Sequence, residues 1–321
     1  MQTQKVGVVV LNWNNGHDTV ECIKSVNLLT HENKQIYVVD NDSTDDSVAH
    51  IAAQFPKLRI YQTGGNLGWS GGNNFGITEA LKDNCDYIYL LNNDAEVFPD
   101  GLTRLLELAE QSQSYGFVGG KIIGFSDPNY IEFCGSFEAP PTNLPESYGG
   151  YAIDLPHFSA PTVVPFISGC SILVSAAVCN AIGLIDNKFF LNYDETDWCY
   201  RGRNAGYLSI FLPEVICRHK RAISFGGVDS PLRIYFCQRN RLLFAARHFT
   251  WPKLLMVFRS LLWEMEKLRV SHGYTSRLSL LYHYREPRVY AFFRGVADFF
   301  FGNFGDCPSY IRIINKSWQE K

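Results

Sequence analysis

The sequence predicts an α/β fold built on a doubly wound, largely parallel sheet. Four apolar runs with the character of strands alternate with segments of helical spacing between residues 6 and 112. Repeats of this length usually give parallel strands with helices on both faces of the sheet. Several of the runs also end at clusters of Asn and Asp residues, and open α/β sheets bind ligands at the carboxyl ends of their strands.

The elements follow from hydrophobic spacing and capping residues. Strands are expected at residues 6–11, 35–39, 58–62 and 87–91. Helices are expected at residues 18–29, at a segment capped by residues 42–46 that runs to residue 53, and at residues 72–82 and 99–112. Beyond residue 115, Gly- and Pro-rich connections separate short strands, as is typical of substrate-facing loops. Long helices are expected at residues 232–248 and 253–270.

Charge is divided unevenly along the chain. The formal net charge is −3. Residues 1–217 hold 11 Lys and Arg against 25 Asp and Glu, a balance of −14, whereas residues 218–321 hold 18 against 7, a balance of +11. We therefore expect the two parts to meet different partners. Nucleic acid is not expected, because bulky apolar residues are mixed with the basic ones and no nucleic-acid motif is present.

The cysteines and the amino terminus indicate a cytoplasmic protein. The nine cysteines contain no Cys-x-x-Cys pair. Their odd number and the lack of close pairs favour reduced thiols over disulfides or a metal site. The first residues are polar and lead directly into a strand, so no signal peptide is expected. No apolar run reaches the length of a membrane-spanning helix.

Five motifs occur in an order that resembles family 2 inverting glycosyltransferases of the GT-A fold. Each motif alone is weak, and the order makes the match specific. The chain is most similar to the rhamnosyltransferase and galactofuranosyltransferase branch, over roughly residues 5–248. The motifs are Val6 to Asn14, Val39-Asp40-Asn41-x-Ser43-x-Asp45-x-Ser47, Asn66-x-Gly68-Trp69-Ser70-x-Gly72-x-Asn74-x-Gly76, Asn92-Asn93-Asp94 and Asp194-Glu195-x-Asp197-Trp198-Cys199-x-Arg201.

The resemblance implies a division of the chain. Residues 1–230 would form the GT-A catalytic domain, a Rossmann-like mixed sheet with a nucleotide-binding half at about 1–115 and an acceptor-binding half at about 116–230. Residues 231–321 would form a basic, aromatic-rich helical extension.

The first two motifs would bind the nucleoside of the donor. In the family, the aspartate that ends the second strand accepts hydrogen bonds from the base, and Asp40 holds this position. A carboxylate suits the imide N–H of uracil or thymine. Asn12 and Asn14 would line the same base and ribose pocket. The alternatives are that Asp40 belongs to a turn and helix cap and that both asparagines are structural.

The segment from Asn66 to Gly76 is dense in glycine at an expected strand-to-helix junction. Backbone N–H groups at such a junction can approach anionic phosphates. Asn66 and Gly72 are therefore candidate donor-binding residues, although a glycine-rich loop is weak evidence by itself.

Asn92-Asn93-Asp94 stands where the family carries its Asp-x-Asp metal motif. Asp94 can bind Mg²⁺ or Mn²⁺ directly, because hard cations prefer carboxylate oxygen. Asn92 replaces the first acidic residue and brings no charge, so metal dependence should be weaker than with two aspartates. Asn92 and Asn93 remain candidate donor-binding residues. In the rhamnosyltransferase-like members of the family, Asn-Asn-Asp is common at this position.

His219 matches the position of the family's metal-binding histidine, after the expected strand at residues 208–212. Together with Asp94, diphosphate oxygens and water it would complete an octahedral site. The alternative is an ordinary surface histidine. The neighbouring Arg218, Lys220 and Arg221 would neutralise the departing diphosphate.

Asp194 to Asp197 open an expected helix. An inverting transfer needs one general base to take the proton of the acceptor hydroxyl, and by motif position this base is Glu195, with Asp194 as the other candidate. Asp194, Asp197 and Trp198 are candidate acceptor-binding residues, and Asp197 could instead hold the helix start or pair with Arg201. The alternative is that these acidic residues only complement a helix amino terminus.

The basic extension should determine where the acceptor is met. At residues 254–263 and 292–301, aromatic and aliphatic residues are interspersed with arginines. This composition is typical of an interfacial helix on an anionic membrane, which would make the protein peripheral at the inner face of the plasma membrane. The alternative is a helical subdomain that packs on the catalytic core or on a partner subunit in an oligomer.

The resemblance implies a metal-assisted transferase that moves L-rhamnose from dTDP-rhamnose to a glycan or lipid-linked acceptor in cell-surface polysaccharide synthesis. A UDP-sugar transferase, such as a galactofuranosyl- or N-acetylglucosaminyltransferase, is the competing enzyme. From another class, a non-catalytic nucleotide-sugar-binding protein is the alternative.

Overall fold

The computed structural model describes residues 4–151, 156–220, 227, 229–271, 273 and 276–320. The chain divides into two compact units. Unit 1 comprises Met1–Phe137, Pro145–Asn187 and Asp194–Arg221, and unit 2 comprises Glu138–Leu144, Lys188–Tyr193 and Ala222–Lys321.

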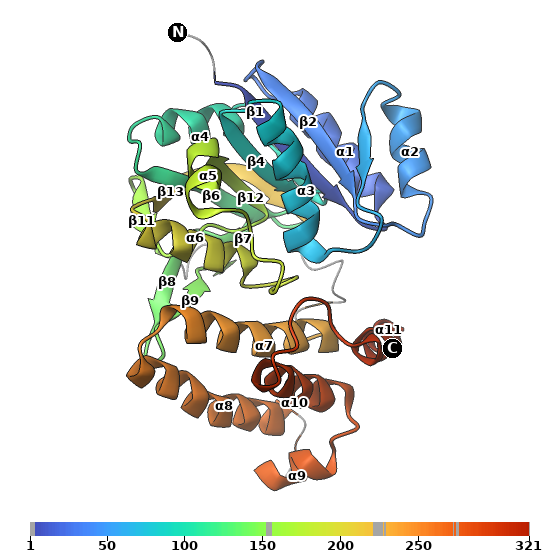
Figure 1. Ribbon diagram of the computed structural model, residues 1–321, viewed down its shortest axis with the longest axis vertical. Helices are drawn as coiled ribbons and strands as arrows, with labels where there is room; N and C mark the ends of the chain where they lie inside the picture. Colours follow the sequence, from blue (N-terminus) through green and yellow to red (C-terminus); the bar gives the residue numbers. More distant parts are fainter. Residues whose placement is uncertain are drawn as a thin grey trace. The chain divides into compact units, whose positions relative to one another are not determined.

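A mixed sheet forms the core of unit 1 (Figure 1). Among the described residues its main path runs β10-β7-β6-β12-β4-β1-β2-β3, with β13 paired to β5, β6 and β11. β8 (Ser136–Ala139) and β9 (Leu144–Ser147) form a separate pair. The strands of the sheet are β1 (Val6–Asn12), β2 (Lys34–Asp40), β3 (Ile60–Gln62), β4 (Tyr87–Asn92), β5 (Ala95–Val97), β6 (Tyr115–Gly124), β7 (Tyr130–Phe133), β10 (Gly150–Tyr151), β11 (Thr162–Val164), β12 (Ser171–Ser175) and β13 (Leu208–His219).

The predicted Rossmann-like mixed sheet is confirmed. β3, β2, β1 and β4 are parallel to one another. β12 is antiparallel to both β4 and β6, and β13 is parallel to β6. The parallel strands thus lie in the half expected to bind nucleotide. The mixed half begins at β12, which is antiparallel to its neighbours.

The helices of unit 1 cover both faces of the parallel strands (Figure 1). Thr19 of α1 donates a hydrogen bond to Asn12 at the end of β1, whereas the backbone of α3 lies against Val9 and Leu11. Since strand side chains alternate between faces, α1 and α3 lie on opposite sides. The helices are α1 (Gly16–Asn27), α2 (Ser47–Gln54), α3 (Gly68–Lys82), α4 (Gly101–Ala109), α5 (Ala176–Ile182) and α6 (Asp194–Asn204).

Helix α3 begins one turn earlier than the sequence predicts, at Gly68 instead of Gly72. Glycine disfavours helices in isolation, which is why the run was expected to be a loop. The structure supplies the compensating interaction: a Cβ on Gly72 would lie 2.4 Å from Leu11 Cδ1, and one on Gly76 would lie 2.3 Å from Val9 Cγ1. These two glycines let the helix backbone pack directly on β1.

Unit 2 is helical, and the two long helices predicted for this region are confirmed. Ser230 caps α7 by accepting a hydrogen bond from the Arg233 N–H, and Pro231 occupies the first turn, where its missing N–H costs nothing. The helices are α7 (Pro231–His248), α8 (Trp251–Ser271), α9 (Arg277–Tyr282), α10 (Pro287–Phe300) and α11 (Ser309–Gln319).

Two fully buried polar residues of α7 hold the segment 188–193, which belongs to the same unit. Asn240 Nδ2 donates to the carbonyl oxygens of Phe189, Leu191 and Asn192 at 2.8–2.9 Å. Arg239 donates to the carbonyls of residues 188 and 189. Side-chain donors take the place of regular secondary structure here, because buried carbonyl oxygens need partners.

We predict that Gly76→Ala destabilises the protein by about 1–3 kcal/mol, because the added methyl group must displace Val9 or lift α3 from β1. Urea unfolding of the variant measures the loss. Thr78→Ala is the matched control, since Thr78 is exposed on the same helix. Equal stability of Gly76→Ala and the wild type would contradict the packing role of this glycine.

Candidate active site

Three parallel strands end level with one another at one edge of the sheet. In the strand register Asn12 pairs with Asp40, and Leu11 pairs with Asn92. Polar residues that are far apart in sequence therefore meet at the carboxyl ends of β1, β2 and β4. Ligands bind at such an edge in α/β proteins.

Asn12 and Asp40 form a buried polar network at this edge. Asn12 Nδ2 donates to Asp40 Oδ1 at 2.9 Å and to Ser43 Oγ at 3.0 Å, while Thr19 Oγ1 donates to Asn12 Oδ1 at 2.7 Å. Asp40 is only 3% exposed and also accepts from the Ser43 N–H. The turn interpretation of Asp40 thus has a structural basis, and contact with a nucleobase stays a prediction.

Asn14 differs from Asn12 in being exposed, with a left-handed φ of 51°. Its Oδ1 accepts a hydrogen bond from the Thr44 N–H at 2.7 Å, and its own N–H donates to Ser43 Oγ at 2.9 Å. Asn14 therefore joins the loop after β1 to the loop after β2, next to the Asn12–Asp40 network.

Asn66 lies at the start of α3, where its Oδ1 accepts hydrogen bonds from the Gly68 N–H and from Asn41 Nδ2. Asn41 Oδ1 in turn accepts from the Leu67 N–H at 3.0 Å. These bonds fix the first turn of α3 to the end of β2. Gly72 lies further along the helix against Leu11, so its glycine is explained by packing, and contact with the donor remains a prediction.

The first turn of α3 also joins two other motifs. Trp69 Nε1 donates to Asn92 Oδ1 at 3.1 Å, and Ser70 Oγ donates to Asp194 Oδ2 at 3.0 Å. The ring of Trp69 packs over Gly169, where a Cβ would lie 2.7 Å from Trp69 Cζ2. Adjacent residues thus connect the Asn92-Asn93-Asp94 turn to the start of α6.

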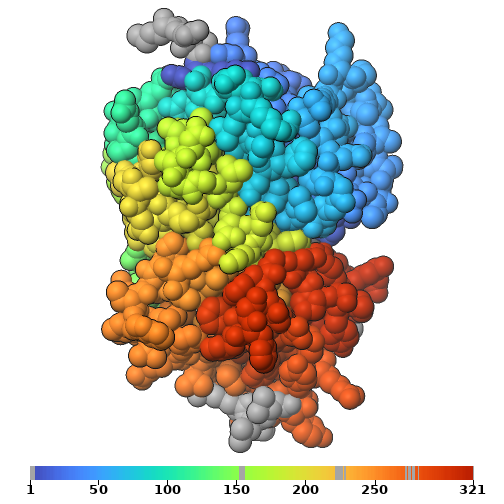
Figure 2. Space-filling model, in the orientation of Figure 1, coloured from blue at the N-terminus to red at the C-terminus, as the bar shows by residue number. Residues whose placement is uncertain are grey.

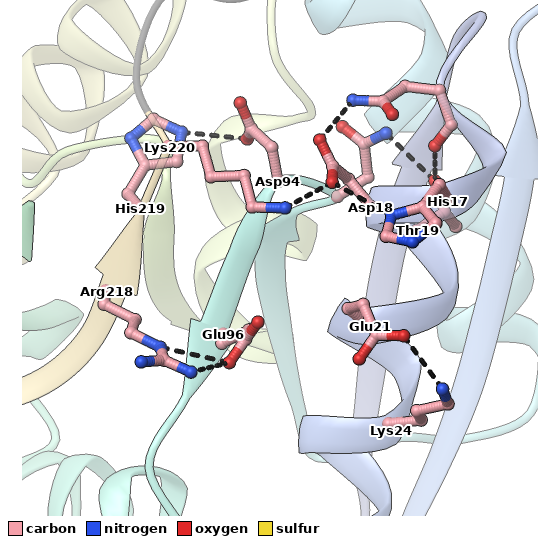
Figure 3. Close-up of polar contacts among 12 residues, drawn as sticks. His17, Asp18, Thr19, Glu21, Lys24, Asp94, Glu96, Arg218, His219 and Lys220 are labelled. Atoms are coloured by element: carbon pink, nitrogen blue, oxygen red, sulfur yellow. Dashed lines mark hydrogen bonds and ion pairs between the residues drawn. The ribbon is translucent and has the colours of Figure 1, made fainter. Parts of the chain in front are cut away.

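Asp94 and His219, the predicted metal pair, are in direct contact (Figure 3). His219 is opposite Ala95 in the antiparallel pairing of β5 and β13, which places its Nε2 2.9 Å from Asp94 Oδ1. Its Nδ1 lies 2.8 Å from Glu132 Oε2 on β7. Burial alone would lower the pKa of His219, but the hydrogen bonds and charges of Asp94 and Glu132 outweigh it and raise the pKa to about 10.

The pair offers an imidazole nitrogen and a carboxylate oxygen, both of which are donor types that divalent cations accept. The 2.9 Å contact between His219 Nε2 and Asp94 Oδ1 is a hydrogen bond, which coordination of a metal ion by both atoms would replace. Glu132 on the other ring nitrogen is the carboxylate that usually orients a metal-binding histidine. The described residues hold no metal-binding cluster of three or more His, Cys, Asp and Glu side chains, so other ligands would have to come from the substrate or water.

The flanking cations are held in ion pairs (Figure 3). Arg218 binds Glu96 Oε2 through Nε at 3.1 Å and Nη2 at 2.6 Å. Lys220 Nζ binds Asp18 Oδ1. Arg221 lies outside the described residues. Neutralisation of a diphosphate by Arg218 or Lys220 would thus compete with these pairs.

The carboxylates of Asp194 and Glu195 lie side by side at the start of α6. Asp194 is 2% exposed and accepts a hydrogen bond from Ser70, whereas Glu195 keeps part of its surface accessible. Burial raises the pKa of Asp194, and it raises the pKa of Glu195 well above its usual range, with the charge of Asp194 adding to the effect. A carboxylate with a raised pKa is a stronger base once it is ionised, and partial access lets an acceptor hydroxyl reach it.

Asp197 and Trp198 are buried, and their positions do not support direct contact with an acceptor. The Asp197 side chain is 0% exposed and accepts from Arg201 Nε at 2.9 Å, so pairing with Arg201 is the alternative that the structure favours. Trp198 is fully buried in the core, and its Nε1 donates to the Gly183 carbonyl. Arg201 also donates to the carbonyls of Ile182 and Leu184, both at 2.7 Å.

Sequence reasoning missed three residues of the site: Glu132, Trp69 and Ser70. Trp69 and Ser70 stand inside a quoted motif, but their partners are 23 and 124 residues away. Glu132 is in the loosely patterned region and contacts a histidine 87 residues away. An alternating strand pattern at residues 130–133 was the available signal, but it does not identify a partner.

More than half of the chain matches a known family. The model of "Glycosyl transferase family 2" matches residues 7–180. The chain belongs to this family.

Curated relatives of this family 2 enzyme are named as hexosyl- and rhamnosyltransferases. The chain is 26% identical to the low-salt glycan biosynthesis hexosyltransferase Agl10 of Haloferax volcanii, over 74% of each chain. It is 24% identical to the dTDP-rhamnosyl transferase RfbF of Shigella flexneri, over 73% of this chain and 79% of RfbF. It is 23% identical to the N-acetylglucosaminyl-diphospho-decaprenol L-rhamnosyltransferase of Mycobacterium tuberculosis, over 78% and 87%.

Solved structures share the fold at low sequence identity. The mannosyltransferase PcManGT from Pyrobaculum calidifontis, in complex with GDP-Man and Mn2+, is similar over 93% of this chain and 87% of its own, with a TM-score of 0.58 and 12% identity. TarS 1–349 of S. aureus in complex with UDP-GlcNAc has a TM-score of 0.53 and 13% identity, over 93% and 92%.

These comparisons confirm several expectations. The GT-A fold with C-terminal helices, the rhamnosyltransferase-like branch of family 2 and the enzyme class of a hexosyltransferase are confirmed.

All nine cysteines are free thiols. Within the described ranges, no helix is both long and apolar enough to span a bilayer.

We predict that Arg201→Met lowers the free energy of unfolding by about 3 kcal/mol, because the buried Asp197 carboxylate loses the cation it faces. Guanidinium unfolding measures the change. Arg203→Met, on the exposed side of the same helix, should change stability by less than about 1 kcal/mol. Similar losses for both variants would contradict a structural role for the Asp197–Arg201 pair.

Proposed function

We propose that this family 2 enzyme is an inverting transferase that passes a sugar from a nucleotide donor to an acceptor hydroxyl in one displacement. The observation that carries the proposal is the bridge made by Trp69 and Ser70, which ties the Asn92 turn to Asp194. A donor-binding end and a carboxylate pair are thereby held by one turn of helix. This is the arrangement that a single displacement needs, with the base near the bond that breaks.

Glu195 is the proposed base. It is the more accessible carboxylate of the pair, whereas Asp194 is engaged with Ser70 and orients its neighbour and the acceptor. The acceptor oxygen attacks the anomeric carbon while Glu195 takes the hydroxyl proton. The bond from that carbon to the diphosphate breaks, and the diphosphate leaves with the electron pair. No covalent sugar–enzyme intermediate is formed.

Asp94 and His219 are the proposed ligands of Mg²⁺ or Mn²⁺, and Glu132 holds His219 in position. The bound cation supplies positive charge for the diphosphate oxygens. Asn92 adds no charge and instead accepts a hydrogen bond from Trp69. This neutral substitution makes a weaker metal site than one with two carboxylates.

The proposed donor is dTDP-rhamnose. Relatives named as rhamnosyltransferases support it, as does the position of Asp40 for a thymine or uracil base. The proposed donor-binding residues are Asn12, Asn14, Asp40, Asn66, Gly72, Asn92, Asn93 and Asp94. A UDP-sugar remains the alternative. The chain is also 23% identical to galactofuranosyltransferase GlfT2, over 60% of this chain and 32% of GlfT2.

The proposed acceptor is a glycan or lipid-linked sugar used in cell-surface polysaccharide synthesis, met at the cytoplasmic face of the membrane. The relative named as acting on N-acetylglucosaminyl-diphospho-decaprenol supports a lipid-linked acceptor. The free cysteines are consistent with a reducing compartment.

We predict that Glu195→Gln lowers the transfer rate by about 10²-fold or more, because the amide cannot accept the hydroxyl proton. Transfer from dTDP-rhamnose, UDP-galactofuranose and UDP-N-acetylglucosamine to a pyrophosphoryl-lipid sugar is measured by mass spectrometry. The variant should bind nucleotide like the wild type, and wild-type kcat/KM should fall as pH drops through the raised pKa of Glu195.

Undiminished transfer by Glu195→Gln would refute the assignment of the base. Wild-type transfer from a UDP-sugar alone would move the donor assignment to the alternative. Nucleotide binding without transfer from any donor would favour the non-catalytic protein.

We predict that Asp94→Asn and His219→Gln each weaken Mn²⁺ binding in the presence of dTDP, because each removes a ligand. Glu132→Gln should weaken it by about tenfold through loss of the oriented imidazole. The electron paramagnetic resonance signal of free Mn²⁺ reports the bound fraction. Asp127→Asn, in the loop between β6 and β7, is the control. Unchanged binding in both ligand variants would place the metal elsewhere.

A further inference from the structure

Helix α8 of unit 2 buries very little of its surface. It has 21 residues, and among those that the structure describes only Leu254 and Val257 are buried. A helix of this length in a packed domain normally covers its apolar stripe with neighbouring elements. In α8, most of the large apolar residues are not covered in this way.

The exposed residues of α8 lie on one face. At 100° per residue, positions 251, 255, 259, 262, 263 and 270 fall within one half of the helix circumference. Figure 2 shows part of this region of the chain, in orange, at the molecular surface. The exposed apolar residues are Trp251 (75% exposed), Leu255 (55%), Met256 (46%), Leu262 (52%), Trp263 (60%) and Val270 (62%).

The charge on this face is of one sign. Arg259 and Lys267 are exposed, and the Lys267 ammonium lies 3.5 Å from the centre of the Trp263 ring. Neither acidic residue of the helix is exposed. Glu266 pairs with Arg269 at 2.6 Å, and Glu264 lies 3.6 Å from Lys267 and 3.7 Å from Arg241. This face of α8 thus has two exposed cations, Arg259 and Lys267, and no exposed carboxylate.

The apolar surface continues onto the end of α10. Phe258 of α8 stacks on Phe300, with ring centroids 5.7 Å apart. Phe300 is 62% exposed, and Phe301 beside it is 79% exposed. We call this continuous surface, made of the exposed α8 residues with Phe300 and Phe301, the α8 face.

We propose that the α8 face binds the surface of a membrane that contains anionic lipids. Tryptophan and phenylalanine rings partition into the region between headgroups and acyl chains, while arginine and lysine meet lipid phosphates. The inference adds a docking surface to the proposed function, and it rests on that function only for the lipid-linked acceptor.

The charge pattern favours a membrane over a second copy of the chain. A two-fold symmetric contact through this face would bring Arg259 and Lys267 of two copies together with no exposed carboxylate to offset them. Anionic headgroups offset these charges directly. Nucleic acid would satisfy the cations but would leave the large apolar side chains without a partner.

The test is sedimentation of the full-length protein with vesicles of phosphatidylcholine, with and without phosphatidylglycerol. We expect binding that depends on phosphatidylglycerol. Leu262→Ser combined with Trp263→Ser should lower the partition coefficient about tenfold or more, and Arg259→Gln and Lys267→Gln about fivefold each. Leu28→Ser and Lys316→Gln, exposed residues elsewhere, should change nothing.

Equal partitioning of the wild type and the face variants would overturn the proposal. So would concentration-dependent self-association in analytical ultracentrifugation that the double variant abolishes, without vesicle binding. Thermal unfolding verifies that the variants fold. Transfer to a water-soluble acceptor reports the proposed function separately, since it should be unchanged in all these variants.

Discussion

The first turn of α3 is the constraint on which the candidate site depends. Trp69 binds Asn92 at the end of β4, and Ser70 binds Asp194 at the start of α6. The turn can occupy this position because Gly72 and Gly76 bring the helix backbone onto β1, and because Asn41 anchors its start to the end of β2. Gly72 and Gly76 belong to a segment that resembles a phosphate-binding loop, but their role in the structure is to let α3 pack on β1. The position of α3 in turn aligns the two halves of the site.

The second half of the site shows how strand pairing substitutes for sequence proximity. Asp94 and His219 are 125 residues apart, yet the pairing of β5 with β13 brings them into contact. Both residues are nearly buried, and Glu132 fixes the remaining nitrogen of the ring. Arg218 projects from the same strand beside them and pairs with Glu96. Alternation along one strand therefore separates a candidate metal ligand from a structural ion pair.

Much of this could be predicted from the sequence because the relevant signals are local. Continuous apolar runs identified the buried strands, and the polar residues that end them identified the edge of the sheet. The start of α3 was placed too late, since glycine's low helix propensity concealed a packing role. Asp197 and Trp198 were expected near an acceptor, but they are interior residues. Their motif position gave no information on burial, and the contacts of Ser70 and Glu132 depend on long-range topology that no local pattern contains.

The central claim is that this strand edge binds a nucleoside diphosphate together with a divalent cation. Calorimetric titration of dTDP, UDP and GDP into the purified protein, with and without Mn²⁺, tests it most directly. The account predicts that dTDP binds more tightly than GDP and that Mn²⁺ strengthens the binding. Absence of binding by all three nucleotides, with Mn²⁺ present, would contradict it.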